Sequence, residues 1–247
     1  MKNVIINGPI NDLRISRSNF LIMRYPKRNQ IKCSNLMPVN KEPKLMLSAD
    51  ELNLLNNRDW ILTKRVVIDK INELLGDLAA RQKNILLNHA DILPKELFAY
   101  NAKISKGENY LQFPFLILDY PRYFKDENIF AVRTMFWWAN FFSVTIHLSG
   151  AYKQKYQQSL LSNYNEIKSY GYFVNVHQSQ WHHYFEEDNY KAVNEISKEE
   201  FAIIIEQKKF IKLAARFPLQ QWQQIPLLLE KTFTHFFDML QNQLPNR

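Results

Sequence analysis

The stretch from residue 141 to residue 148 alternates apolar and polar side chains, which constrains the fold more than any other feature of the chain. A period of two places successive side chains on opposite faces of a β-strand. We therefore predict a strand here, with one face in the core and one polar face toward solvent. The apolar positions are Phe142, Val144, Ile146 and Leu148, and the polar positions are Ser143, Thr145 and His147.

Further strands are expected on both sides of this one. Apolar and aromatic runs at 113–121 and 129–138 precede it, and shorter runs at 172–177, 181–185 and 190–194 follow. Ala139 and Asn140 are expected to form a two-residue hairpin turn, because asparagine tolerates the left-handed conformation. Such short connections favour antiparallel neighbours, since parallel strands need long crossovers.

Helices are expected before, between and after the strands. Capping boxes at Ser48–Glu51 and Ser197–Glu200 mark two helix starts. The expected helices cover 48–56, 60–87, 151–169, 197–216 and 219–243. This order predicts an α+β fold: a single antiparallel β-sheet of about five to six strands, with helices packed mainly on one face.

Positive charge is concentrated at the N-terminus. Residues 1–47 contain nine cations and two anions, a net charge of +7, whereas the other 200 residues contain 23 cations and 22 anions. We expect residues 1–47 to be a basic, loosely ordered extension, or to reflect a start codon assigned too early. Residues 48–247 are expected to form a single globular α+β domain. A basic arm that binds nucleic acid or an acidic partner is the other interpretation.

Several classes of protein are excluded by residue usage. The five glycines are scattered, so no phosphate-binding glycine loop can form. A single cysteine, Cys33, excludes a disulfide framework and any multi-cysteine metal site. No metal or other cofactor is expected. No apolar run approaches the ~18 residues of a membrane span, and we expect a cytoplasmic protein that does not act on membranes.

The polar face of the central strand is the candidate ligand surface. With a two-residue turn, residues pair when their numbers sum to 279, so that Thr134 faces Thr145. Trp138, Thr145 and His147 then share a face that combines aromatic, hydroxyl and imidazole groups, as ligand pockets do. The alternative is an ordinary polar face in contact with solvent. A register shift of one residue would exchange the faces of one strand relative to the other.

Two further residues complete the candidate binding set. Arg133 falls on the core face in this register, where it needs a carboxylate such as Asp119, or it holds the carboxylate or phosphate of a ligand. His177, from the later strands, is expected near His147. The candidate binding residues are therefore Arg133, Trp138, Thr145, His147 and His177.

The sequence leaves three functions open. The first is a small-ligand-binding or interaction module. The alternative is a small-molecule enzyme that uses His147 or His177 as general base. The second alternative is nucleic-acid binding through the basic arm, although the nearly neutral globular part is not expected to bind nucleic acid. Neither the ligand nor the oligomeric state can be derived from the sequence.

Overall fold

The computed structural model describes residues 46–241 of the chain. The chain divides into two compact units, the first ending at Arg58 and the second beginning at Asp59. The described part of the first unit contains helix α1 (Ala49–Asn56). Its capping box is confirmed: the amide of Glu51 donates to Ser48 Oγ (3.2 Å), and the amide of Ser48 donates to Glu51 Oε2 (2.7 Å). Most of the expected N-terminal extension lies outside the described residues and stays a prediction.

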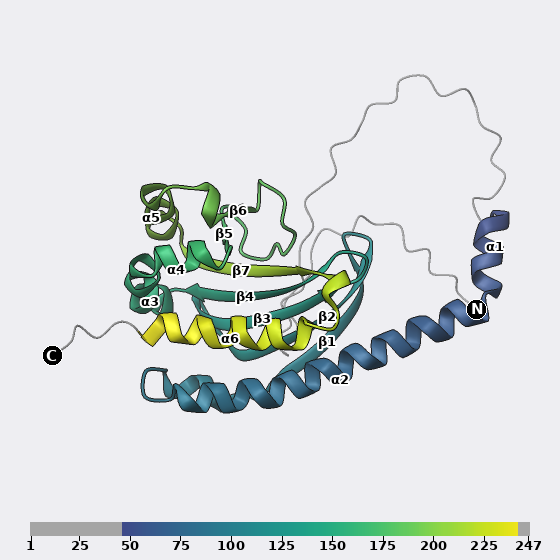
Figure 1. Cartoon of the computed structure of the whole chain (residues 1–247), viewed down its shortest axis with the longest axis horizontal. Coiled ribbons are helices and arrows are strands. Elements are labelled where there is room, and N and C mark those ends of the chain that lie inside the picture. The colour runs from purple at the N-terminus through teal and green to yellow at the C-terminus, as the bar shows by residue number, and fades with distance from the viewer. Residues whose placement is uncertain (1–45, 242–247) are drawn as a thin grey trace, which may run out of the picture. The chain divides into compact units, whose positions relative to one another are not determined.

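The second unit is built on one antiparallel sheet of seven strands, in the order β1-β2-β3-β4-β7-β5-β6 (Figure 1). The α+β class and the single antiparallel sheet are confirmed, with slightly more strands than expected. The strands are β1 (Lys103–Tyr110), β2 (Phe113–Lys125), β3 (Asn128–Trp137), β4 (Phe141–Ser149), β5 (Phe173–Asn175), β6 (Tyr190–Ala192) and β7 (Phe210–Pro218).

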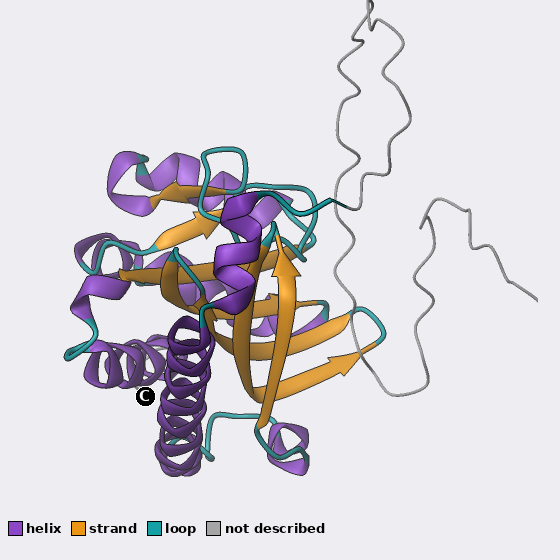
Figure 2. Ribbon diagram, turned by 90° about the vertical axis from the view of Figure 1, so that its right-hand side faces the viewer, coloured by secondary structure: helices purple, strands orange, loops and turns teal. Residues whose placement is uncertain are grey.

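The helices pack mainly on one face of this sheet. Figures 1 and 2 show α2 and α6 running along the same side of it. The four apolar side chains of β4 are fully buried there, in a core that includes Leu78 of α2 and Phe236 of α6. The helices are α2 (Arg58–Asn88), α3 (Ala151–Ser162), α4 (Tyr164–Ser169), α5 (Lys198–Gln207) and α6 (Ile225–Gln241), with 3₁₀ turns η1 (Lys95–Ala99), η2 (Val193–Glu195) and η3 (Leu219–Gln221).

The hairpin between β3 and β4 differs from the predicted one by a residue. Arg133 lies opposite Thr145, so paired residue numbers sum to 278 rather than 279. The turn has three residues because Ala139 takes a positive φ of 60° and the amide of Asn140 donates to Trp137 O. The predicted register is therefore wrong. Arg133 lies on the polar face with Thr145, not on the core face.

Two other segments fold differently from the prediction. The helix that begins after the Ser197 cap ends at Gln207, and the chain continues as β7 between β4 and β5. Residues 210–215 are a short apolar run interrupted only by Lys212, which is consistent with a strand buried on both faces. Residues 103–110, where no strand is expected, form the edge strand β1. Residues 181–185, expected as a strand, belong to the connection between β5 and β6.

That connection, residues 176–189, covers part of the polar face of the sheet. We refer to it as the covering segment. It contains neither helix nor strand, and side chains of β3, β4 and β7 hydrogen-bond to it. Every residue of β4 is buried, including Thr145 and His147. The predicted contact of this face with solvent is therefore wrong, because a segment distant in sequence shields it.

Candidate functional site

An ion pair on the polar face joins β2 to β3. Asp119 and Arg133 lie directly opposite each other. Arg133 Nε donates to Asp119 Oδ1 at 2.7 Å, and its Nη2 donates to Oδ2 at 2.8 Å. The third nitrogen, Nη1, donates to His183 Nε2 of the covering segment at 2.9 Å. Asp119 is the partner that the sequence proposed for Arg133, and the bidentate geometry is the strong form of such a pair.

His147 of β4 and Lys212 of β7 form a second pair on this face and lie directly opposite each other. Lys212 is 1% exposed, and its ammonium donates to the carbonyl oxygens of Gln180 (3.1 Å) and His182 (2.5 Å). His147 Nε2 donates to Gln180 Oε1 at 2.9 Å. The two strands therefore hold the covering segment through side-chain hydrogen bonds.

The electrostatics of this cluster disfavour positive charge. Burial lowers the pKa of His147 and His183 well below 6.5, and the charges of Lys212 and Arg133 lower both pKa values further. Burial also lowers the pKa of Lys212 well below 10.5, with Arg133 and Lys208 adding to the effect. A neutral His183 agrees with its hydrogen bond, because Nε2 can accept from Arg133 only when unprotonated.

Arg133 keeps its charge despite burial. Burial opposes the charged form, but the neighbouring Asp119 carboxylate outweighs it and raises the pKa of Arg133. The carboxylate of Asp119 is thus occupied by Arg133. Lys212, by contrast, has carbonyl oxygens as the hydrogen-bond partners found in the described structure.

Aromatic rings anchor the two ends of the cluster. The Tyr110 hydroxyl accepts a hydrogen bond from the amide of His183 at 2.7 Å. The Phe185 ring stacks on Tyr190, with centroids 4.5 Å apart. Trp181 packs edge-on against His147 at 5.8 Å. The covering segment is therefore seated by apolar contacts as well as by polar ones.

The structure brings together three of the five residues proposed from sequence. Arg133, Thr145 and His147 lie on the same face of β3 and β4. Trp138 does not join them: it lies in the turn and packs against Phe136, beside the helix-covered core. A face shared with Thr145 and His147, as the shifted register implied, is wrong for Trp138.

His177 lies at the start of the covering segment rather than on a strand. Its ring packs against His182, with centroids 4.2 Å apart, and its carbonyl oxygen accepts a hydrogen bond from Lys208. Its Nδ1 accepts from the amide of Ser179 at 2.8 Å. His177 therefore belongs to the edge of the cluster, where the covering segment meets Lys208.

Sequence reasoning missed Lys212, His183 and Gln180. Lys212 lies in the part of the expected 197–216 helix that forms β7, and the short apolar run around it does not distinguish a strand from a helix. His183 and Gln180 lie in a segment without periodicity, so no local pattern indicated which surface they cover.

Metal and membrane features were also sought in the residues that the structure describes. Within residues 46–241, no group of three or more His, Cys, Asp or Glu side chains is arranged to hold a metal ion. No helix in this range is long and apolar enough to cross a membrane. Cys33 lies outside the described residues.

Comparisons with known proteins give no assignment. No family model matches the chain, and no match was found among the curated proteins or the solved structures.

Proposed function

We propose that this protein is a binding module for a small anionic molecule. The ligand is held between the polar face of the sheet and the covering segment, with Lys212, His147 and Arg133 as the recognising groups. The observation that carries the proposal is the buried ammonium of Lys212, whose partners in the described structure are two carbonyl oxygens and the face of the Tyr190 ring, 5.5 Å away, none of which carries a negative charge.

A buried cation is costly unless an anion or several dipoles compensate it. The carbonyl oxygens of Gln180 and His182 offset part of the cost for Lys212. A carboxylate or phosphate at the same place would offset more, since it brings a full negative charge. Arg133 supplies a planar donor group suited to both of these anions, and its ion pair with Asp119 fixes its orientation.

The arrangement of the cluster also suits a ligand site. Its side chains come from four neighbouring strands, β2, β3, β4 and β7, which form a rigid platform. The covering segment is 14 residues long and irregular. Irregular connections of this length in compact domains are usually functional, and binding residues often combine a rigid scaffold with such a loop.

Binding fits the observations better than catalysis by a histidine. An enzyme would need His147 or His177 as general base. His147 Nε2 is engaged with Gln180, and His177 Nδ1 with the amide of Ser179. His177 would have to give up its hydrogen bond before taking a substrate proton, and burial lowers the pKa of His147, which makes it a weak base. An anion, by contrast, replaces neutral oxygens: the carbonyls on Lys212 and the Gln180 amide oxygen on His147.

The test is a thermal unfolding series of the full chain with sodium phosphate, sulfate, succinate or citrate, compared with sodium chloride at equal ionic strength. We expect at least one of the four anions to raise the wild-type Tm in a saturable way. Lys212→Met should abolish this shift. Lys191→Met, a control at an exposed lysine of β6 that pairs with Glu200, should retain it.

Two outcomes contradict the proposal. One is that none of the four anions raises the Tm above the chloride series. The other is that Lys212→Met folds and keeps the full shift, which would place any anion binding elsewhere on the surface.

A further inference from the structure

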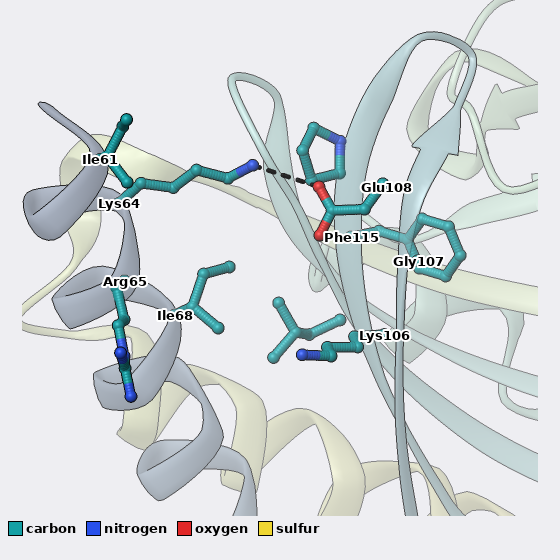
Figure 3. A pocket seen from close by; sticks show the side chains of 10 residues that line it. Ile61, Lys64, Arg65, Ile68, Lys106, Gly107, Glu108 and Phe115 are labelled. Atoms are coloured by element: carbon teal, nitrogen blue, oxygen red, sulfur yellow. Dashed lines mark hydrogen bonds and ion pairs between the residues drawn. The ribbon is translucent and has the colours of Figure 1, made fainter. Parts of the chain in front are cut away.

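A second surface lies where the N-terminal turns of α2 pass the β1–β2 hairpin, on the face of the sheet opposite the anion site. The two elements enclose an open pocket of about 200 Å³ (Figure 3). Ile61 and Ile68 of α2 form one wall, and Lys106 and Pro114 form part of the other. An ion pair between Lys64 Nζ of α2 and a carboxylate oxygen of Glu108, 3.2 Å apart, joins the two walls.

The helix wall of the pocket continues an apolar stripe that is buried elsewhere. Ile61, Ile68 and Leu75 follow one another at intervals of seven residues, so they share a face of α2. Leu75 is fully buried in the core, Ile68 is half-buried, and Ile61 is 49% exposed. The apolar stripe therefore becomes exposed to solvent toward the N-terminus of α2, where Ile61 and Ile68 line the pocket.

Further apolar side chains surround this stripe. Leu62 and Val66 are exposed on the same turns of α2, and Ile104 is exposed on β1. A helix that is apolar on most of its sides is normally covered, and a contiguous exposed apolar patch is typical of an interaction site. This part of the molecule therefore has the composition of a protein-docking surface.

The hairpin wall of the pocket consists of the residues on the face of the hairpin toward α2. These are Lys106 and Glu108 of β1 and Pro114 and Leu116 of β2. Leu116 is buried in the core, which fixes this wall. The Phe115 ring lies on the opposite face, over Gly107 and edge-on to Tyr110, so it is no part of the surface offered to an occupant.

The charges that line the pocket indicate the kind of occupant. Lys64, Arg65 and Lys106 are cationic, and Glu108 is the one anion in the lining. Because Glu108 is paired with Lys64, the charge of Arg65 and Lys106 is left to attract an acidic group. A second copy docked through the same surface would bring like charges together. Residues 1–47, with a net charge of +7, do not complement it either.

We infer that this surface docks an amphipathic helix of a partner protein, with an apolar stripe flanked by Asp or Glu. The apolar stripe of the partner covers Ile61, Ile68 and Pro114, and its carboxylates meet Arg65 and Lys106. This is the helix-in-groove mode of recognition, in which apolar anchors supply affinity and flanking charges select the partner.

The experiment uses the full chain and two fluorescein-labelled helical peptides of roughly 15 residues. Both carry the same leucine stripe, and the flanking positions are Glu in one peptide and Lys in the other. Fluorescence anisotropy is expected to show at least tenfold tighter binding of the Glu peptide. Lys106→Glu is expected to weaken binding of the Glu peptide and to strengthen binding of the Lys peptide, because it reverses the sign of one charge that recognises the peptide.

The matched variants are Ile61→Glu and Ile203→Glu, since Ile203 of α5 is 52% exposed and Ile61 is 49% exposed. Ile61→Glu should abolish peptide binding, and Ile203→Glu should leave it unchanged. The inference is overturned if the two peptides bind equally or not at all, or if both isoleucine variants behave alike. It is also overturned if the chain is a dimer that Ile61→Glu makes monomeric, which would identify a second copy as the occupant.

Discussion

Arg133 donates hydrogen bonds to both carboxylate oxygens of Asp119, at 2.7 and 2.8 Å, and so links β3 to β2 beneath the covering segment. Both side chains are largely buried. The remaining guanidinium nitrogen, Nη1, donates to His183, so Arg133 connects the sheet to the covering segment. The Asp119–Arg133 ion pair therefore supports the structure of the proposed anion site, and Arg133 is also one of the charged groups of that site.

Removing the charge of Asp119 should be strongly destabilising. Asp119→Asn leaves a buried guanidinium without its counter-ion, and we expect a loss of about 3 kcal/mol in the free energy of unfolding. Urea unfolding measures this. The double variant Asp119→Leu/Arg133→Met should lose less than the single variant, because it leaves no uncompensated charge. A double variant that is less stable than the single one would contradict this account.

Stability should fall on acidification below pH 6.5. The folded-state pKa values of His147 and His183 lie well below 6.5, so the unfolded chain takes up protons that the folded chain does not. The free energy of unfolding should therefore drop by up to about 1.4 kcal/mol per pH unit for each histidine. Urea unfolding between pH 7 and pH 5 tests this. His147→Gln should give a shallower slope, and an unchanged slope would contradict the assignment.

A substitution at Thr134 should raise the stability of the protein, because the observed register of β3 and β4 places this residue on the core face. Its hydroxyl is fully buried on the helix side of the sheet and has no hydrogen-bond partner in the described structure. Thr134→Val should therefore stabilise the protein by about 1 kcal/mol, since it removes a buried unsatisfied polar group. Ile146→Val, on the same face, should cost about 1 kcal/mol. A destabilising Thr134→Val would indicate that its hydroxyl is satisfied.

Anion binding at Lys212 should be linked to proton uptake. Burial holds the pKa of Lys212 well below 10.5 in the unliganded protein, and a bound anion would raise that pKa. The apparent affinity should then weaken as the pH rises above the lowered pKa of the free protein. Calorimetry in buffers of different ionisation enthalpy measures the protons taken up. Binding that releases protons, or that exchanges none, would contradict the role given to Lys212.

The first 36 residues should contribute little to stability. They carry much of the +7 charge of residues 1–47 and show no regular apolar periodicity. Deleting residues 1–36 is expected to leave thermal unfolding cooperative, with a Tm change below about 5 °C. Circular dichroism tests this expectation. A larger decrease in Tm would show that this segment is part of the folded structure.

Local patterns in the sequence predicted the parts of the fold that depend on neighbouring residues. The alternation along β4 identified its core face, with Val144 and Ile146 fully buried as expected. The capping residues Ser48 and Ser197 marked the starts of α1 and α5, because a cap is decided by the side chain three residues away. Neither feature needs information from a distant segment.

The register between β3 and β4 could not be read in the same way. It depends on whether Ala139 adopts a left-handed conformation, which alanine does rarely. That single backbone choice moved Arg133 from the predicted core face to the polar face. The strand β7 was missed for a related reason, because the strong helix start at Ser197 gave no indication that the helix ends at Gln207.

The candidate site was predictable in part. The alternation along β4 placed Thr145 and His147 on one face, whereas Arg133 was placed on the core face and singled out only because a buried arginine needs a partner such as Asp119. Lys212 requires the pairing of β4 with β7, whose paired residues are 61 to 77 positions apart in the chain. The covering segment has no periodicity, so its place over the polar face is decided by tertiary contacts.

The way in which the covering segment is held has a kinetic consequence. Its ends are fixed by the pairing of Val176 with Asn189, but its interior is attached by side chains such as Lys212 and Arg133. It can therefore swing away while every strand of the sheet stays paired, a local opening that costs less than global unfolding. Ligand entry would then follow this opening, and the observed association rate should reach a plateau at high anion concentration, set by the opening rate alone.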